Sequence, residues 1–182
     1  MTIKTERLML RDLCESDASD VYALFSDKEA MYYLDLPHPN IEHTQQYINV
    51  ILAKYQNDPR RCYEMAVVLN ESNTFVGVVN LEVEHPYLKD ARACLDYYFI
   101  PQFWGKGYAT EASKALIKFA FETLEVNKIA TGTLKCNVGS ETVMKKCGLL
   151  QEAELKQHTK FNGEWVNRVE YAILKCEYFG KQ

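Results

Sequence analysis

Residues 101–112 read Pro-Gln-Phe-Trp-Gly-Lys-Gly-Tyr-Ala-Thr-Glu-Ala, a glycine-containing turn between a predicted strand and a predicted helix. The preceding residues 91–100 are rich in Tyr and Phe, which is typical of a β-strand. From residue 108 to residue 124 the apolar side chains recur at helical spacing. Such a turn directs several backbone N–H groups and the positive end of a helix at one point. The stretch therefore predicts an anion site suited to a pyrophosphate.

The two glycines of this turn narrow the kinds of site that it can form. Gly105 and Gly107 let the backbone approach a ligand closely, because neither carries a Cβ. A Walker loop is excluded, since Lys106 is followed by Gly107 and not by Ser or Thr. A dinucleotide fingerprint would need a third glycine where the chain has Thr110, and an earlier place in the chain. A plain strand-to-helix turn without a ligand stays open as the alternative.

Length and composition predict a single domain, residues 1–182, that is large enough to bury a core. The net charge of −4 argues against a nucleic-acid binder and mildly favours a cationic acceptor. The sequence shows neither a transmembrane stretch nor the apolar core of a signal peptide, so we expect no membrane contact and a cytoplasmic location. Six scattered cysteines and four histidines without ligand spacing predict reduced, mostly buried thiols and no metal.

The order of predicted elements is β-α-α-β-β-β-α-β-α-β-β, which indicates one mixed α/β domain. Ser16 is the expected N-cap of the first helix, and Asn162-Gly163 predicts a two-residue hairpin turn. The strands are expected at residues 8–13, 63–69, 75–83, 91–100, 128–135, 150–160 and 166–175, and the later helices at 42–55, 108–124 and 140–146.

Several segments in a fixed order carry a family resemblance. They are Thr5-Glu-Arg-Leu-Met-Leu-Arg11, residues 101–112, Asn137-x-x-Ser140, Lys146-Cys-Gly-Leu149, Asn162-Gly-Glu-Trp165 and Tyr171-Ala-Ile-Leu174. With them the chain resembles the GNAT-superfamily N-acetyltransferases, in the branch of the ribosomal-protein-alanine acetyltransferases and spermidine acetyltransferase. The resemblance implies a single GNAT-like α/β domain. Its mixed, mostly antiparallel central sheet of about seven strands is splayed in the middle and flanked by about four helices.

Acetyl-CoA is the co-substrate that this resemblance implies, with its pyrophosphate on the glycine loop. The family signature Gln/Arg-x-x-Gly-x-Gly/Ala fits in two registers, from Gln102 or from Trp104. The second register leads directly into the helix and is preferred, with Trp104 as a buried side chain that packs the loop. The pantetheine arm would lie in the splay, along the backbone of residues 97–99, like an added strand. The implied coenzyme-binding residues are Tyr97, Tyr98, Phe99, Trp104, Gly105, Lys106, Gly107, Tyr108, Ala109, Thr110 and Asn137.

Asn137 fits a role as a turn or cap residue equally well. The catalytic residues are harder to assign, because the family often has a Tyr that acts as the general acid where this chain has Met144. Ser140 is the predicted acid for the leaving thiolate, and helix N-cap is its alternative role.

The predicted general base is Asp96. The family often has a carboxylate at the position of Cys94, and Asp96 lies two residues further on, on the same face of the strand. Glu82 and Glu84 on the neighbouring strand are the alternatives.

The acceptor is expected to enter between residues 31–40 and the final hairpin. It would be an amine-bearing small molecule, such as a polyamine, or a protein N-terminus. Tyr32, Tyr33 and Tyr87 could stack on a cation or cover core, and Asp35 could attract an amine. Two functions stay open: an acetyl-CoA-dependent N-acetyltransferase that works by direct attack in a ternary complex, and a catalytically weak acyl-CoA-binding sensor or interaction domain of the same fold. A homodimer also stays open.

Overall fold

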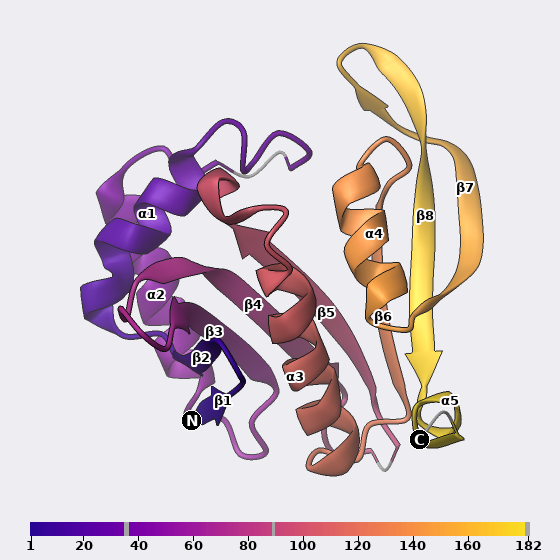
Figure 1. Cartoon of the computed structure of the whole chain (residues 1–182), viewed down its shortest axis with the longest axis horizontal. Helices are drawn as coiled ribbons and strands as arrows, with labels where there is room; N and C mark the ends of the chain where they lie inside the picture. Colours follow the sequence, from indigo (N-terminus) through magenta and orange to yellow (C-terminus); the bar gives the residue numbers. More distant parts are fainter. Residues whose placement is uncertain (35–36, 89, 181–182) are drawn as a thin grey trace.

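The computed structural model describes residues 1–34, 37–88 and 90–180, and Asp35 lies outside the described residues. Eight strands form one sheet in the order β1-β2-β3-β4-β5-β6-β8-β7, as Figure 1 shows. The strands are β1 (Thr2–Lys4), β2 (Leu8–Asp12), β3 (Cys62–Leu69), β4 (Phe75–Glu84), β5 (Arg92–Phe99), β6 (Lys128–Leu134), β7 (Leu150–Phe161) and β8 (Glu164–Leu174). Among the described residues only β5 and β6 pair in parallel, so the prediction of a mixed, mostly antiparallel sheet is confirmed.

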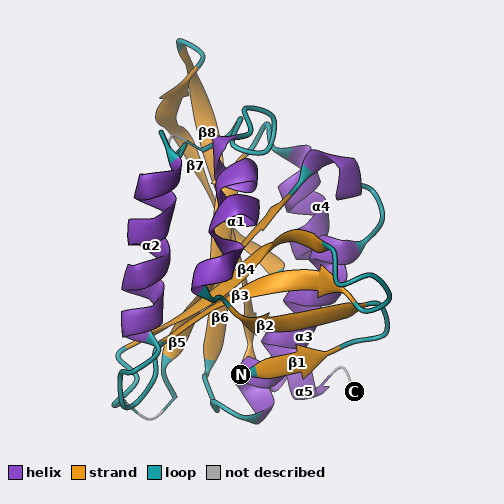
Figure 2. Cartoon of the chain, turned by 90° about the vertical axis from the view of Figure 1, so that its left-hand side faces the viewer, coloured by secondary structure: helices purple, strands orange, loops and turns teal. Residues whose placement is uncertain are grey.

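Helices cover both faces of the sheet. The α-helices are α1 (Ala18–Ser26), α2 (Ile41–Lys54), α3 (Tyr108–Glu122), α4 (Val138–Lys146) and α5 (Lys175–Gly180). Buried residues of α1 and α2 share one core cluster, and those of α3 and α4 share another. Figure 2 shows α1 and α2 side by side on their face of the sheet. The short elements β1 and α5 are the ones that periodicity did not predict, because neither is long enough to show a pattern.

Strand β3 illustrates how the two cores arise from alternation. Its residues Tyr63, Met65 and Val67 face the α3 cluster. Cys62 and Ala66 face the α1–α2 cluster. Because successive side chains of a strand point to opposite faces, a strand covered on both faces is apolar at nearly every position.

The sheet opens between β5 and β6. The parallel pairing covers only three residue pairs, from Arg92 with Lys128 to Cys94 with Ala130. Strand β5 nevertheless continues to Phe99 alongside β4, and β6 continues alongside β8, so the two strands diverge (Figure 1). The predicted splay is confirmed.

Local details of the first helix and the last hairpin divide the predictions. Ser16 is not the N-cap of α1: it lies inside a 3-10 turn, Glu15–Asp17, that precedes the helix. The Asp17 carboxylate instead accepts the Cys14 backbone N–H, 2.9 Å away, and so closes this turn. The hairpin prediction is confirmed, since Asn162 and Gly163 both have positive φ, 51° and 85°, and connect β7 directly to β8.

All six cysteines are free, but the expectation that most are buried is wrong. Only Cys62 and Cys147 are buried, whereas Cys14, Cys136 and Cys176 are exposed. Among the described residues, no helix is both long and apolar enough to span a bilayer.

Candidate functional site

The glycine loop joins the end of β5 to the start of α3 by way of a 3-10 turn, Pro101–Phe103. Gly105 and Gly107 have φ values of 73° and 82°, a left-handed conformation that glycine adopts without strain. Gly107 is also the N-cap of α3, and no side chain caps this helix end. The N–H groups of the first turn, which have no acceptor within the helix, therefore remain available to an anion.

Trp104 ties this loop to the strand before it. Its indole Nε1 donates a hydrogen bond to the Phe99 carbonyl oxygen, 2.7 Å away. The side chain is 48% exposed, so the expectation of a buried Trp104 is wrong. The residues that follow it in the loop, 105–107, are exposed as well, which leaves the indole without a cover on that side.

The backbone of β5 offers unpaired edge groups where β6 departs. The Ile100 N–H donates to the Val76 carbonyl of the neighbouring β4, 3.0 Å away. Because backbone groups of an antiparallel strand alternate in direction, those of Tyr97 and Phe99 point to the opposite edge, toward the splay. The Phe99 carbonyl is taken by Trp104, and the Phe99 N–H and the Tyr97 backbone are left to face the gap.

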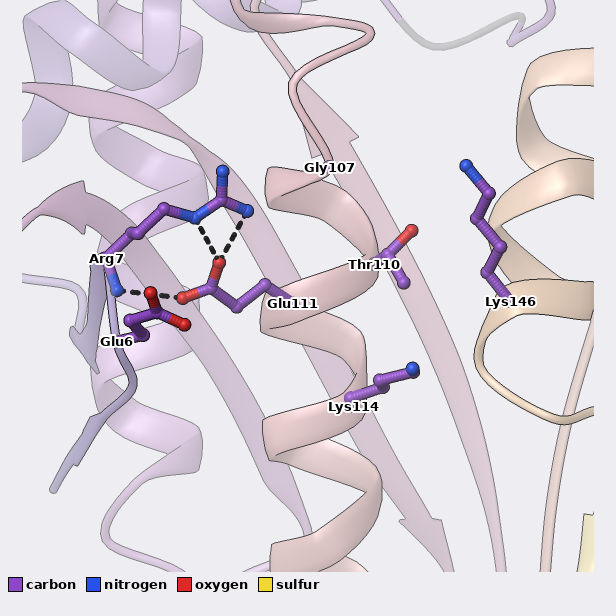
Figure 3. A pocket seen from close by; sticks show the side chains of 7 residues that line it. All are labelled: Glu6, Arg7, Gly107, Thr110, Glu111, Lys114 and Lys146. Atoms are coloured by element: carbon purple, nitrogen blue, oxygen red, sulfur yellow. Dashed lines mark hydrogen bonds and ion pairs between the residues drawn. The ribbon is translucent and has the colours of Figure 1, made fainter.

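An ion pair holds the first turn of α3 against the N-terminal segment, as Figure 3 shows. Thr5 Oγ1 and the Arg7 N–H donate to Glu111 Oε1 over 2.6 and 2.9 Å. Arg7 Nε and Nη2 both lie 2.7 Å from Glu111 Oε2, and Arg7 Nη1 donates to the Lys106 carbonyl over 3.0 Å. Burial alone would raise the pKa of Glu111, but the hydrogen bonds from Thr5 and Arg7 outweigh it and lower that pKa.

A pocket opens beside the first turns of α3, next to this ion pair. Its lining residues are Glu6, Arg7, Gly107, Thr110, Glu111, Lys114 and Lys146 (Figure 3). Lys114 points from α3 toward the α4 side, where Lys146 lies. Since Arg7 neutralises Glu111, two lysines face the single remaining carboxylate of Glu6, and the pocket favours an anion.

Sequence reasoning assigned no role to Arg7, Glu111, Lys114 or Lys146. Thr5 and Arg7 stood in a quoted motif, but nothing local indicates that they contact Glu111, which lies more than a hundred residues further along the chain. A basic residue near the chain start and an acidic residue in the first turn of the helix were the only signals.

The sequence left a cap role open for both Ser140 and Asn137, and the structure assigns it to Asn137. The N-cap of α4 is Asn137, whose Oδ1 accepts the Ser140 N–H over 3.1 Å, so the N-cap role for Ser140 is wrong. The Ser140 hydroxyl lies 2.8 Å from the Tyr97 hydroxyl, which also lies 2.9 Å from the Ser140 carbonyl. Burial raises the pKa of Tyr97 above its ordinary range, so this phenol stays protonated.

Asp96 belongs to a polar row across three strands. Glu64 of β3 pairs with Asn80 of β4, and Asn80 pairs with Asp96 of β5. Glu64 is only 5% exposed, and the Tyr47 hydroxyl of α2 donates to its carboxyl group. Burial, with the nearby Asp96 charge, raises the pKa of Glu64 to about 8, and burial also raises the pKa of Asp96. The Asn80 Oδ1 atom is buried and has no donor among the described residues.

The alternative bases have basic partners. Glu82 forms ion pairs with Lys54 and Arg61, at 3.6 and 3.0 Å. Glu84 forms one with Arg92 at 3.7 Å.

The two predicted catalytic residues lie on opposite faces of β5. Tyr97, which contacts Ser140, packs against the α3 core, whereas Tyr98 packs against the α1–α2 core. By strand alternation Asp96 shares the face of Tyr98. The structure therefore does not bring Asp96 and Ser140 together on one face, and the splay beside β5 is the route between them.

The two segments expected to admit an acceptor contact each other. Asn162 Nδ2 at the hairpin tip donates to the Tyr32 hydroxyl over 2.9 Å, and the rings of Tyr33 and Phe161 stack with centroids 5.5 Å apart. The Tyr33 hydroxyl donates to the Cys136 carbonyl over 3.3 Å, just before α4. Tyr87 is 80% exposed in a separate loop.

Comparisons with known proteins agree with this geometry. Residues 7–150 match the family model described as Acetyltransferase (GNAT) domain. The uncharacterized N-acetyltransferase YnaD of Bacillus subtilis is 28% identical over 178 residues, which cover 98% of this chain and 99% of the relative.

Two solved structures share the fold at lower identity. A ribosomal L7/L12 alpha-N-protein acetyltransferase, RimL, in complex with coenzyme A has a TM-score of 0.83 at 20% identity, covering 96% of this chain and 98% of that one. The spermidine N-acetyltransferase of Vibrio cholerae in complex with CoA and spermine has a TM-score of 0.81 at 21% identity, covering 96% of this chain and 99% of that one.

Proposed function

Because the chain belongs to the acetyltransferase (GNAT) family, we propose that it transfers the acetyl group of acetyl-CoA to a primary amine by direct attack in a ternary complex. The observation that carries the proposal is the glycine loop, with its uncapped helix end, placed directly beside a gap in the sheet. The loop supplies N–H groups for a pyrophosphate, and the gap supplies an open strand edge for an extended arm.

The coenzyme would follow the loop and the open edge of β5. The amides of residues 105–109 and the Thr110 side chain would hold the pyrophosphate, and the backbone of Tyr97 and Phe99 would bond the pantetheine arm. Asn137 caps α4 at the far side of the gap and would contact the same arm. The lysine-lined pocket beside α3 would receive the remaining phosphate of the coenzyme.

The faces of β5 fit the direction of the chemistry. In direct attack the amine nitrogen bonds to the thioester carbonyl carbon, the C–S bond breaks, and its electron pair stays on sulfur. An amine that is cationic in solution loses one proton to water before the attack, and Asp96, on the α1–α2 face, would accept the second proton, which the nitrogen loses as the C–N bond forms. Ser140, on the other face, would donate a hydrogen bond to the departing thiolate. The amine would thus approach the gap from one face of the sheet, and the thiolate would depart toward the other face.

Tyr97 supports the role proposed for Ser140. Its hydroxyl can donate to the Ser140 carbonyl oxygen, and in the contact with the Ser140 hydroxyl either group can be the donor. When the phenol donates to the Ser140 hydroxyl oxygen, the serine keeps its own hydrogen for the gap. The family's usual tyrosine is absent here because the buried Met144 takes its place, so Ser140 and Tyr97 together would supply the donor.

The acceptor would be an amine that is cationic in solution, either a polyamine or a protein N-terminus. The Asp96 carboxyl group on the open strand β5 and the net charge of −4 favour such a substrate. The similar structures described as a spermidine N-acetyltransferase and a ribosomal L7/L12 alpha-N-protein acetyltransferase add support for these two classes.

Thiol release from acetyl-CoA across a panel of polyamines, N-terminal peptides and amino acids tests the proposal. We expect release with at least one cationic amine. Coenzyme A binding without release for any amine would instead favour the sensor domain. A Gly107→Val variant should lose about tenfold or more of its CoA affinity, because a Cβ at φ 82° is strained and would lie 3.4 Å from Arg7 Nη2.

Gly163→Val is the matched control for this strain. Gly163 has a similar φ of 85°, nothing within 4 Å of its missing Cβ, and a place at the hairpin tip far from the loop. It should lose stability and keep its CoA affinity. Equal affinities in both folded variants would show that the loop is not the phosphate cradle.

A further inference from the structure

Glu111 poses an electrostatic problem for the proposed coenzyme site. A carboxylate in the first turn of a helix stabilises that helix, because it faces the positive end of the dipole. The same charge repels an anion that binds at this helix end. Glu111 lies one turn from Gly107 and lines the same pocket. Protonation does not remove its charge near neutral pH, since its hydrogen bonds lower its pKa.

Arg7 is placed to cancel this charge. Its Nε and Nη2 both lie 2.7 Å from Glu111 Oε2, so the guanidinium covers the carboxylate edge that faces the loop. The guanidinium also lies over the Tyr108 ring, with 4.8 Å between its carbon and the ring centroid. These contacts fix the side chain although it is 44% exposed.

The same side chain restrains the loop itself. Arg7 Nη1 donates to the Lys106 carbonyl over 3.0 Å, directly between the two left-handed glycines. A loop carbonyl held by Arg7 cannot turn toward a bound phosphate, so the neighbouring N–H groups keep that direction. One residue from the segment before β2 thus acts on both the charge and the backbone of the cradle (Figure 3).

We propose that Arg7 is a positioning residue for the phosphate groups of the coenzyme: it neutralises Glu111 and holds the Lys106 carbonyl so that the α3 end accepts an anion. This inference rests on the proposed function, and it adds a residue outside the glycine loop to the binding of the coenzyme.

The test compares two thioesters, acetyl-CoA and S-acetylpantetheine, which has the same reacting arm and no phosphate. In Arg7→Gln the KM for acetyl-CoA and the Kd for CoA should rise about tenfold. The KM for S-acetylpantetheine should stay within about twofold of the parent value. A general loss of structure would raise both KM values alike, and that result would overturn the proposal, as would unchanged CoA affinity.

Glu111→Gln gives an expectation of opposite sign. Removal of the carboxylate leaves Arg7 positive, so this variant should bind CoA as tightly as the parent or tighter. Weaker binding would mean that the pair is only a structural clasp, and would reject the neutralisation. The double variant with both glutamines should recover affinity relative to Arg7→Gln alone, and failure to recover would reject it too. The Glu111→Gln result also tests the proposal if Arg7→Gln folds poorly.

Arg11→Gln is the matched control. Arg11 forms a bidentate ion pair with Asp17 at 2.7 Å on β2, away from the glycine loop. Its loss should lower the melting temperature and leave the ratio of the two KM values unchanged. If the parent protein does not bind CoA at all, the proposed function fails. If the parent binds CoA and Arg7→Gln binds it with the same affinity, only the inference about Arg7 is rejected.

Discussion

The carboxylates on the two sides of the splayed sheet have opposite environments. Glu111, at the α3 end, is covered by Arg7 and Thr5, and these bonds lower its pKa. Glu64 and Asp96, on the α1–α2 face, form no ion pair among the described residues, and burial raises the pKa of both. The chain thus keeps the charge of Glu111 paired with a cation, whereas burial of the other two carboxylates favours their neutral forms.

This difference follows the chemistry proposed for each side. Where a carboxylate lies beside an anion site, its charge must be cancelled. Near the surface a basic side chain can pair with the carboxylate without a large loss of solvation free energy. A site that deprotonates an amine needs a base whose pKa lies nearer to the working pH, and at Asp96 burial produces that shift because it outweighs the opposing effects of Asn80 and Arg168. All three groups are carboxylates, and the residues around each one decide its chemical role.

The largest expected effect is on the amine side, in Asp96→Asn. The amide cannot accept the amine proton, so turnover should fall about 100-fold at neutral pH, within the range for a general base. The parent rate should rise with pH through a value above the ordinary Asp range, because the raised pKa delays ionisation of Asp96. The variant should lack this rise, and steady-state rates from pH 5 to 9 provide the measurement.

Glu82→Gln is the competing variant for the same role. Its carboxylate is held by Lys54 and Arg61, so its loss should leave the pH profile in place. A reversed outcome, with a flat profile for Glu82→Gln and a normal one for Asp96→Asn, would move the base to β4.

An intermediate effect is expected at the leaving-group side, in Ser140→Ala. Loss of one hydrogen bond to a charged thiolate should lower turnover about tenfold and leave the KM for acetyl-CoA nearly unchanged. Tyr97→Phe keeps the ring and the backbone of β5, and should lower turnover about threefold through Ser140. Tyr98→Phe, on the opposite face, should behave as the parent.

Stability should hardly account for these losses, because Asn137 and not Ser140 caps α4. A Ser140→Ala protein that is fully folded and loses less than about threefold in turnover would dispose of the leaving-group role.

The last expected effect concerns stability and its dependence on pH, and not turnover. Glu64 has a folded pKa of about 8 against an ordinary value of 4.5. Its neutral form therefore contributes stability that is complete below the ordinary value and is lost as pH rises toward the folded one. The loss amounts to at most about 1.4 kcal/mol per pH unit in that window. Melting temperatures from pH 5 to 8 should fall less steeply in Glu64→Gln than in the parent.

Glutamine is a suitable probe because its amide offers an acceptor to Tyr47 and a donor toward Asn80. The ion-paired carboxylates Asp12 and Asp17 have lowered pKa values, so their contribution is lost on acidification and lies outside this window. An unchanged slope in Glu64→Gln would mean that Glu64 is ionised in the folded protein at neutral pH. The contrast with Glu111 would then disappear.

The elements that the sequence predicted well are those determined by a pattern of residues close together in the chain. The 101–112 stretch predicts its strand, turn and helix because two glycines interrupt a run of aromatics and a helical repeat. Asn162-Gly163 predicts its turn because both positions need positive φ. Trp104 was expected to be buried because a tryptophan is large and apolar, and local sequence does not report whether a cover for it exists.

The sequence by itself determined the alternation that builds two cores, the glycine loop and the family, since each depends on residues close together in the chain or on their fixed order. Tertiary structure alone decided that Arg7 covers Glu111, that Asn80 lies between Glu64 and Asp96, and that Tyr97 reaches Ser140. These contacts join residues 16 to 104 positions apart. The distances between these groups depend on the order of the strands and on where the sheet opens. The charge and the proton affinity of each group depend on those distances.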